Sequence, residues 1–446
     1  MNFRQHLAWL KSRHQLLTID QQVDCHLEAA EIVRQLSHQS LASAIHLQNL
    51  DCSRFSVVAN LFFPRGSDDV FFGTHDGFCE ALAAIPDAVP GTLSLAAWLN
   101  TQSDYAYLLQ DQLHSDLKKV ETLYDLPLLR YWPGDAGPYL SLSVAIVRAL
   151  DGTIHCGVYR LQVQGPRQLT VHCLPGSRTQ QIYRDYQQAG QEMPMVVVMG
   201  IDPAVLLSAL LPLDVDVDSI GFAGWVQGEA ITCCASPMHG LPMPSHCEMV
   251  LEGVVGRDDP KMDGPHGNFC GTYTTPVLCP VMTVDQIWGR EDAICPVTVV
   301  GPPPAESYCL ARARLPYVKW RMTRDFEWVT DVKWIETAEY HNALIVQIKD
   351  YCNENGRDVL FDHQLMQGAS MVVLVDQSAD LSCPEQIVWQ CFNVSWREVV
   401  YYHKETLVVD ATQIGSRQRL EPDSHVRRRV EQRLKRWNLD MHRGLQ

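Results

Sequence analysis

The stretch from Val250 to Thr274 limits the possible folds of this chain more than any other segment. It places five glycines, two prolines and a run of acidic residues between two apolar segments that are typical of strands. Glycine permits backbone angles that other residues avoid, and it lets a ligand come close to the main chain. We therefore expect a loop held between two strands, of the kind that carries binding residues on a rigid scaffold.

The composition is that of an ordinary globular protein with an acidic balance. Of 446 residues, 46% are hydrophobic and 20% are charged, and the formal net charge is -16. This length suffices for two or three domains. Nucleic acid is not an expected partner, because phosphate binding needs a cationic surface. The longest apolar run, around Ala204–Leu213, is too short for a membrane span, and the polar N-terminus is unlike a signal peptide. We expect a cytoplasmic protein.

Fifteen cysteines are scattered along the chain, with no Cys-x-x-Cys pair. Several lie inside apolar segments such as Ile231–Ala235, which is typical of reduced, buried thiols rather than of a disulfide framework. One group of neighbouring His and Cys residues fits no standard zinc spacing, so no zinc site is expected there. Its members are His239, His246, Cys247, His266 and Cys270.

The first part, residues 1–108, alternates helix and strand signals, as small α/β domains do. Apolar residues at helical spacing predict a helix over residues 3–16, and residues 21–36 open extended and continue as a helix. The other expected elements are strands at Ala44–Leu47 and Phe55–Leu61 and helices near Asp76–Ile85 and Leu93–Leu99.

The second part, residues 109–300, has short alternating strands joined by tight turns. Asp151-Gly152 between two such runs is a strong hairpin signal. The sequence predicts an antiparallel barrel with two helical interruptions. Its clearest elements are strands at Tyr139–Leu150, His155–Val163 and Leu169–Leu174 and helices at Gln180–Ala189 and Pro203–Leu210.

The third part, residues 301–446, follows a proline-rich linker at Gly301–Glu306. It is expected to form a second α/β domain with a strand at Met371–Asp376, a helix at Pro384–Cys391 and a strand at Thr406–Asp410. The basic tail His425–Trp437 is expected to form a terminal amphipathic helix. Docking on a neighbouring subunit is favoured for it over a membrane or nucleic acid. The fold class is therefore α/β (α+β) throughout.

Asp263-Gly-Pro-His-Gly-Asn268 resembles the Glu-Gly-Pro-Phe-Gly-Glu/Asp loop of the UbiD family. Members of that family are reversible decarboxylases of aromatic and α,β-unsaturated acids that use prenylated FMN. Glu248–Gly253 resembles the lead-in to that loop, and similar segments run from Val23 to Thr412. The resemblance implies a central split β-barrel of the flavin-reductase type, a small-molecule carboxylic acid as substrate, and a homo-oligomer, either dimer or hexamer.

The resemblance also implies which residues would react. The segment His155–Val163 resembles the one that carries the family's catalytic arginine, which corresponds to Arg160; a guanidinium stays charged and forks onto a carboxylate. The loop's first glutamate corresponds to Asp263, which can still pair with Arg160. The second, the family's proton donor, corresponds to Asn268, and an amide is not an acid. His266 is the candidate replacement because imidazole titrates near neutral pH, although loop histidines are commonly only solvated.

The family anchors the flavin phosphate through a divalent metal held by Asn, His and Glu. Counted without gaps from Arg160, these three positions fall on His155, Gly176 and Ser219. None is a carboxylate, which a hard cation bridging a phosphate usually requires, so no metal is expected. Arg178 lies close by and can neutralise a phosphate directly.

Three interpretations of the function remain open. The first is a decarboxylase that binds FMN or prenylated FMN through altered contacts, with His155, Arg178 and Ser219 at the phosphate. The second is a decarboxylase without flavin, whose remodelled pocket uses His155, Arg160, Asp263 and His266. The third is an inert subunit that partners an active homologue. The first two share one reaction, and we predict a decarboxylase.

Overall fold

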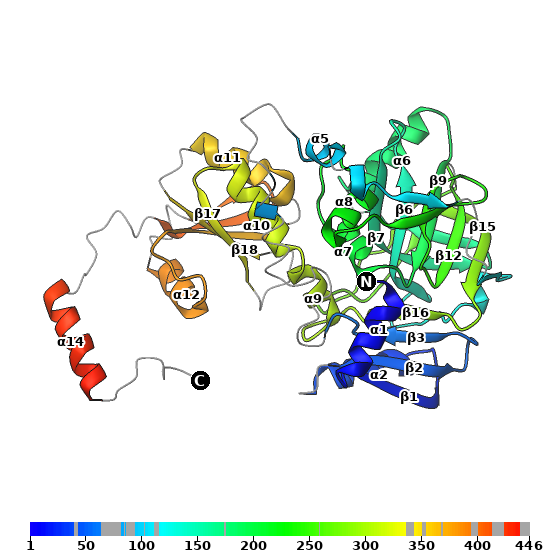
Figure 1. Ribbon diagram of the computed structural model, residues 1–446, viewed down its shortest axis with the longest axis horizontal. Helices are drawn as coiled ribbons and strands as arrows, with labels where there is room; N and C mark the ends of the chain where they lie inside the picture. The colour runs from blue at the N-terminus through cyan, green and yellow to red at the C-terminus, as the bar shows by residue number, and fades with distance from the viewer. Residues whose placement is uncertain are drawn as a thin grey trace.

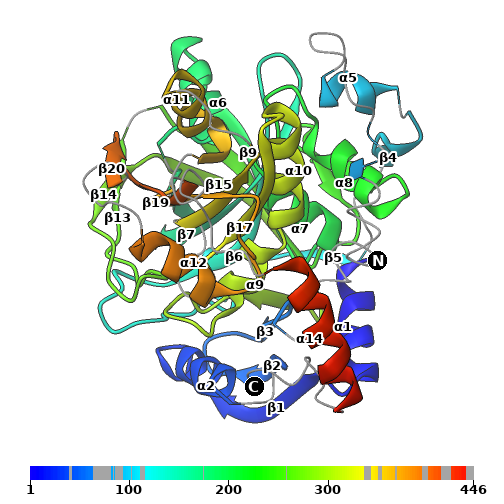
Figure 2. The ribbon, with the colours of Figure 1, turned by 90° about the vertical axis from the view of Figure 1, so that its left-hand side faces the viewer.

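The computed structural model shows a barrel with a small sheet below it and a second α/β unit beside it (Figure 1). Figure 2 turns this second unit toward the viewer, in front of the barrel. The structure describes residues 1–39, 43–63, 82–83, 85, 94–101, 103–110, 116–173, 175–257, 259–335, 343–349, 354–366, 369–393, 400–412 and 423–437.

Six strands close the barrel in the order β12-β9-β6-β7-β8-β15, with β12 paired to β15 and the short β5 (Leu117–Lys119) added outside. The neighbours within the barrel pair antiparallel, as the sequence predicted. The six strands are β6 (Tyr139–Arg148), β7 (Ile154–Gly165), β8 (Gln168–Val171), β9 (Met193–Met199), β12 (Met249–Val255) and β15 (Val281–Arg290).

Alternation along the strands separates two apolar cores. In β6 and β7, Val147 and Leu161 pack with one core, whereas Ile146 and Cys156 pack with the other. Successive side chains of a strand point to opposite faces, so one core fills the barrel and the other covers its outside. Helices α7 (Pro203–Leu210) and α8 (Ser219–Gln227) belong to the outer core. The expected helix at Pro203–Leu210 is confirmed.

The acidic side chains of Glu248–Gly253, the segment before the glycine-rich loop, stabilise the fold. Glu248 is fully buried and accepts two hydrogen bonds from Arg4, at 2.7 and 2.8 Å, which fix the N-terminal helix on the barrel. Glu252 is also buried, and its Oε1 accepts the main-chain N–H groups of Met238 and His239. The pairing of β12 with β15 has a bulge in β15, where Asp285 is skipped between the partners of Glu252 and Gly253. A Cβ at Gly253 would lie 1.9 Å from the carbonyl oxygen of Thr283, so this position requires glycine.

The small sheet has the order β1-β2-β3-β16. Its fourth strand, β16, follows the last strand of the barrel in the sequence. The helix predicted over residues 3–16 is shorter than expected: α1 ends at Ser12, His14 has a positive φ, and Leu16 begins β1. Parallel pairing of β1 with β2 overrides the local helical pattern there. The elements are α1 (Phe3–Ser12), β1 (Leu16–Val23), α2 (Glu28–Ser37), β2 (Ala44–Leu50), β3 (Ser56–Ala59) and β16 (Ile294–Val297).

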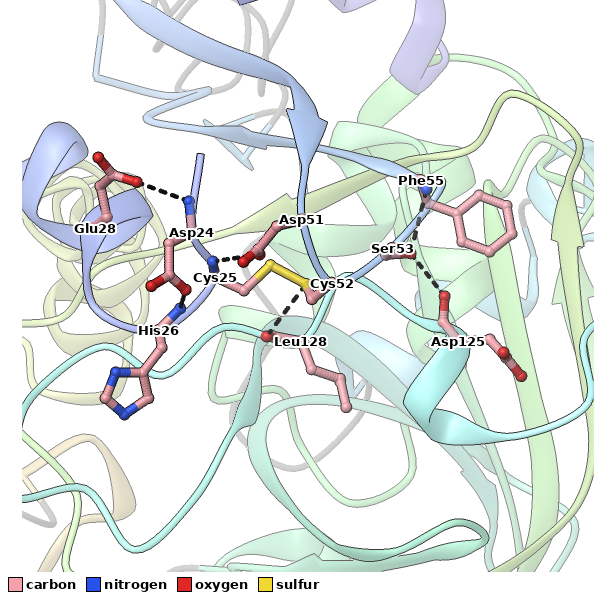
Figure 3. The surroundings of a disulfide bond; sticks show 10 residues. All are labelled: Asp24, Cys25, His26, Glu28, Asp51, Cys52, Ser53, Phe55, Asp125 and Leu128. Carbon is pink, nitrogen blue, oxygen red and sulfur yellow. Dashed lines mark hydrogen bonds between the residues drawn. A yellow bond between two sulfur atoms is a disulfide. The ribbon is translucent and has the colours of Figure 1, made fainter. Parts of the chain in front are cut away.

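One disulfide contradicts the expectation of reduced thiols throughout. Cys25 follows β1 and Cys52 follows β2, and the two are bonded with their Cα atoms 6.1 Å apart (Figure 3). The parallel register pairs Val23 with Leu50, so the two strand ends lie side by side. Asp51 accepts the N–H of Cys25 at 3.0 Å. Sequence spacing alone could not show this proximity, because it results from the strand pairing.

The second α/β unit contains a five-stranded sheet in the order β17-β18-β19-β21-β20. The strands predicted at Met371–Asp376 and Thr406–Asp410 are confirmed as β19 and β21, and the helix predicted at Pro384–Cys391 is α12. Its elements are α9 (Glu306–Arg312), α10 (Leu315–Asp325), β17 (Val329–Trp334), β18 (Ala343–Ile348), α11 (Glu354–Asp362), η3 (Gln364–Met366), β19 (Met371–Asp376), α12 (Pro384–Phe392), β20 (Val400–His403) and β21 (Thr406–Asp410).

The remaining short elements connect or cover the barrel. The helix expected near Leu93–Leu99 is present as α5, whereas most of the one expected near Asp76–Ile85 lies outside the described residues. These elements are α5 (Leu95–Asn100), η1 (Ser103–Tyr105), β4 (Leu108–Gln110), η2 (Leu123–Asp125), α6 (Arg178–Gln188), β10 (Thr232–Ala235), β11 (Pro242–Pro244), β13 (Lys261–Asp263) and β14 (Val277–Cys279).

The predicted terminal helix is α14 (Ser424–Arg436), which lies apart from the other elements in Figure 1. It has no buried residue, and Val426, Val430 and Trp437 are exposed. Its docking on a neighbouring subunit stays a prediction, as do the domain boundaries. Among the described residues, none of the helices combines the length and apolar character that crossing a membrane requires.

Candidate active site

The β13–β14 hairpin brings the glycine-rich loop against β7 and β8. Gln162 of β7 pairs with Thr170 of β8, and Arg160 points to the same face as Gln162 because the two are separated by one residue. The Gln162 amide oxygen accepts the N–H of Gly264 at 2.9 Å, which ties the loop to this face. Gly264 has φ +87°, a value that favours glycine. The strand face and the hairpin thus enclose Arg160.

Arg160 and Asp263 form the ion pair that the sequence predicted. Arg160 Nη2 donates to Asp263 Oδ1 at 3.2 Å, and Thr170 Oγ1 donates to the other carboxylate oxygen at 2.7 Å. The Asp263 side chain is fully buried and that of Arg160 is 21% exposed. Arg160 Nε is buried and has no hydrogen-bond partner among the described residues. A buried donor without a partner is costly, so this edge of the guanidinium is suited to an acceptor that arrives from outside.

Two side chains that the sequence analysis missed complete this cluster. His172 Nδ1 lies 3.4 Å from Arg160 Nη2, 3.6 Å from Asp263 Oδ1 and 3.5 Å from Cys279 Sγ. Burial, and then the charge of Arg160, lowers the pKa of His172. Burial, and then Asp263, raises the pKa of Cys279 to about 11. The only signal for His172 in the sequence was its even spacing from Thr170; nothing pointed to Cys279.

His266 lies beside this cluster, and its ring faces a different carboxylate, that of Asp135. Its Nδ1 is 3.5 Å from Asp135 Oδ1, and its ring packs on Tyr139 with centroids 4.3 Å apart. Asp135 also accepts the N–H of Gly267 at 2.8 Å. Burial raises the pKa of Asp135, but His266 and the hydrogen bonds from Gly267 and Trp132 outweigh it and the pKa is lowered. The Asp135 carboxylate therefore lies on the Nδ1 side of the ring, where Nδ1 has no hydrogen-bond partner among the described residues, and Nε2 lies on the opposite side.

The hydrogen bonds of Asn268 lie within its own loop. Its side-chain oxygen accepts the N–H of Phe269 at 2.7 Å, and its main-chain N–H donates to Thr272 at 2.8 Å. These bonds shape the turn after His266. No described contact joins Asn268 to Arg160, Asp263 or His172.

His155, Arg178 and Ser219 gather at the other end of β7. Burial, and then the charge of Arg178, lowers the pKa of His155 to about 4, so this imidazole is neutral at pH 7. Ser219 Oγ accepts the N–H of Cys156 at 3.1 Å, and Arg178 Nη2 donates to the carbonyl of Val215 at 3.3 Å. Arg160 lies five positions after His155 along the strand, a rise of about 16 Å.

This second cluster does not fit a metal-bridged phosphate. Among the described residues, two groups of three or more His, Cys, Asp or Glu side chains have the spacing of metal ligands, and neither includes His155. The α8 N-terminus is already capped by Asp218, whose Oδ1 accepts the N–H groups of Ile220 and Gly221. Arg178 is therefore the group that fits a phosphate here, by direct hydrogen bonds.

The fold and the two clusters define a UbiD-type protein, and the comparisons agree. Residues 109–303 match the family's 3-octaprenyl-4-hydroxybenzoate carboxy-lyase Rift-related domain, and residues 7–84 match the corresponding N-terminal domain. The chain belongs to the UbiD family.

The curated relatives extend over most of the chain. An uncharacterized protein of Synechocystis sp. is 27% identical over 87% of this chain and 81% of its own length. One of Aeropyrum pernix is 25% identical over 87% and 83%. One of Archaeoglobus fulgidus is 28% identical over 60% of this chain, which spans 57% of that relative.

Solved structures confirm the architecture. Vanillic acid decarboxylase of Sedimentibacter hydroxybenzoicus superposes with a TM-score of 0.83, at 18% identity, over 98% of this chain and 99% of its own. The UbiD-class enzyme HmfF of Pelotomaculum thermopropionicum, solved with prFMN, gives 0.78 at 20% identity over 96% and 98%. At such identities the likeness concerns the fold alone.

Proposed function

We propose that this protein is a non-oxidative decarboxylase of an aromatic or α,β-unsaturated carboxylic acid, a reaction that can run in either direction. The observation that carries the proposal is the buried Nε–H of Arg160, which has no partner in the part of the chain that the structure describes, beside an Nη2 that Asp263 already holds. A substrate carboxylate that accepts from Nε would be fixed in orientation while Asp263 and Thr170 keep the guanidinium in place.

The reaction breaks the bond between the carboxylate carbon and its neighbour, and CO2 leaves. The electron pair stays on the neighbouring carbon, which then takes a proton. We assign proton return to His266, because its buried ring lies beside the Arg160 cluster with Nδ1 facing Asp135 at 3.5 Å and Nε2 on the other side. Asn268 has no acidic proton to give.

The cofactor is the flavin of the family, as FMN or its prenylated form, bound without a metal. Structural neighbours were solved with FMN or prFMN. In this chain Arg178 would take the phosphate, with Ser219 and the neutral His155 beside it. Such a cofactor, when bound, supplies an electron sink for the carbon that loses CO2. The substrate end of the site would lie at Arg160, about 16 Å along β7 from His155.

Release of CO2 tests the proposal. The protein is produced together with a flavin prenyltransferase and supplied with a panel of aromatic and α,β-unsaturated acids. Arg160→Lys keeps the positive charge but loses the paired N–H donors of the guanidinium. This substitution should lower kcat/KM by about 10²–10³-fold. Arg34→Lys, at an exposed arginine paired with Glu31, is the matched control and should retain activity.

Two results would contradict the proposal. Full activity in Arg160→Lys would remove the assignment of this residue. Absence of CO2 release from the whole panel, together with stable association with a homologue that carries both loop glutamates, would establish the alternative of an inert subunit. The position of Asn268, bonded within its own loop, is the observation that favours that alternative.

A further inference from the structure

The cluster around Asp263 has the chemistry of a metal site, although none of its members belongs to a recognisable metal motif in the sequence. His172, Asp263 and Cys279 each offer one ligand atom, and these three atoms lie within 4.8 Å of one another. His172 directly follows β8, whereas Asp263 ends β13 and Cys279 ends β14, so only the folded hairpin brings them together. This cluster is separate from the positions at His155 and Ser219 where the family places its metal.

Two distances within the cluster match the edges of a tetrahedron around zinc. Zinc binds sulfur at about 2.3 Å, imidazole nitrogen at about 2.0–2.1 Å and carboxylate oxygen at about 2.0–2.2 Å, which gives edges of about 3.6 Å for S to N and 3.3–3.5 Å for N to O. Here Cys279 Sγ lies 3.5 Å from His172 Nδ1, and Asp263 Oδ1 lies 3.6 Å from the same nitrogen. Two of the three edges therefore match those of a zinc site, and the third, between Cys279 and Asp263, lies within 4.8 Å.

A cation already lies against two of the three ligands. Arg160 Nη2 is 3.2 Å from Asp263 Oδ1 and 3.4 Å from His172 Nδ1. Because His172 accepts at Nδ1, that nitrogen carries a lone pair rather than a proton, which is the form that binds a metal. The guanidinium and an ion bound to these atoms cannot occupy the same space, and their charges repel.

We propose that Asp263, His172 and Cys279 form a binding site for a thiophilic divalent cation of the Zn²⁺ class, and that this ion and the Arg160 guanidinium exclude each other. The side chains of Arg160 and His172 are 21% and 18% exposed, so the Arg160 side chain is partly open to solvent and has room to withdraw. Thr170 Oγ1 holds the second oxygen of Asp263 and orients the carboxylate from the outer side. The thiolate selects zinc or cobalt over magnesium and calcium.

Direct binding to the unreacted protein tests this site independently of catalysis. The metal-free protein is titrated with Co²⁺, whose bond to a thiolate gives a charge-transfer absorption band in the near ultraviolet, and then with competing Zn²⁺. The disulfide Cys25–Cys52 is kept intact, since in reduced form it would offer a second pair of thiols next to Asp51. One equivalent with a thiolate band is expected.

Variants at the ligands show whether this cluster is the site. Cys279→Ser should abolish the band, and His172→Gln should weaken binding by more than about 100-fold, because outer partners alone contribute about 10–100-fold. Thr170→Val, which leaves all three ligands, should weaken binding by about 10–100-fold and serves if the other variants fail to fold. Cys173→Ser, at the half-buried thiol next to His172, is the control and should bind as the wild type does.

The decisive variant is Arg160→Met. Removal of the competing cation should raise the Co²⁺ and Zn²⁺ affinity by at least about tenfold. Unchanged or weaker binding in Arg160→Met would overturn the proposed exclusion, and a band that survives in Cys279→Ser would overturn the ligand set. Neither result depends on turnover, so each is distinguishable from a failure of the decarboxylase proposal.

Discussion

The two ends of β7 differ in how their charges are balanced. At the Arg160 end, the guanidinium has a buried carboxylate beside it and one N–H still unpartnered. At the His155 end, one partly buried arginine stands near a neutral imidazole and a helix terminus that its own Asp218 already caps. The first end is arranged for a carboxylate, whereas the second has one cation to offer a phosphate. Under the proposed function, this chain would therefore keep the substrate end of the site more fully than the cofactor end.

The largest expected effect concerns proton return at the Arg160 end. His266→Gln should lower kcat by about 10²–10⁴-fold, since that is the usual contribution of general acid catalysis. Asp135→Asn should have a smaller effect on kcat and shift the pH profile, because Asp135 only orients the ring. His38→Gln, at an exposed position, is the control. Wild-type turnover by His266→Gln in a CO2 assay would show that another group returns the proton.

The next effect is on stability and concerns the His155 end. The pKa of His155 is lowered from 6.5 to about 4, so between these pH values the unfolded chain binds more protons than the folded one. Unfolding free energy must therefore rise with pH across this window, and the full loss at lower pH is about 3 kcal/mol. His155→Gln should remove this part of the loss.

Denaturant unfolding at pH 4 and pH 7 measures the difference. His6 is also buried with its pKa lowered to about 4, so the variant should retain the part of the pH dependence that His6 causes. An identical pH dependence in His155→Gln and wild type would show that His155 is solvated at this end of β7.

These predictions also show how far the sequence leads. The helix Pro203–Leu210 and the strands Met371–Asp376 and Thr406–Asp410 follow from local periodicity, and the structure has them at those residues. The pairing of Arg160 with Asp263 followed from a motif. What the sequence could not show depends on pairing between distant strands. The Cys25–Cys52 bond needs the β1–β2 register, and the contact of His172 with Cys279 needs the β13–β14 hairpin.

The third effect tests whether Arg178 holds a phosphate. Arg178→Met should weaken FMN binding by about 10–100-fold, because a hydrogen bond to a charged group contributes about 1.5–3 kcal/mol. Arg184→Met, at an exposed arginine further along α6, is the control. Quenching of flavin fluorescence measures both affinities. Equal affinities in the two variants would place the phosphate elsewhere and reduce the contrast between the two ends of β7.

The smallest effect comes from the carboxylate that caps α8. Asp218→Asn keeps a good N-cap while it removes a negative charge from the helix terminus near Ser219. A single charge at a helix terminus contributes about 0.3–1 kcal/mol, so FMN affinity should rise by about two- to fivefold. Burial raises the pKa of Asp218, so the gain should be complete above this raised pKa and should shrink as the pH falls through it and the wild-type carboxyl protonates. An equal gain at every pH would mean that the variant acts through the shape of the helix end and not through charge. The geometry of the helix end, rather than its charge, would then limit FMN affinity at the His155 end of β7.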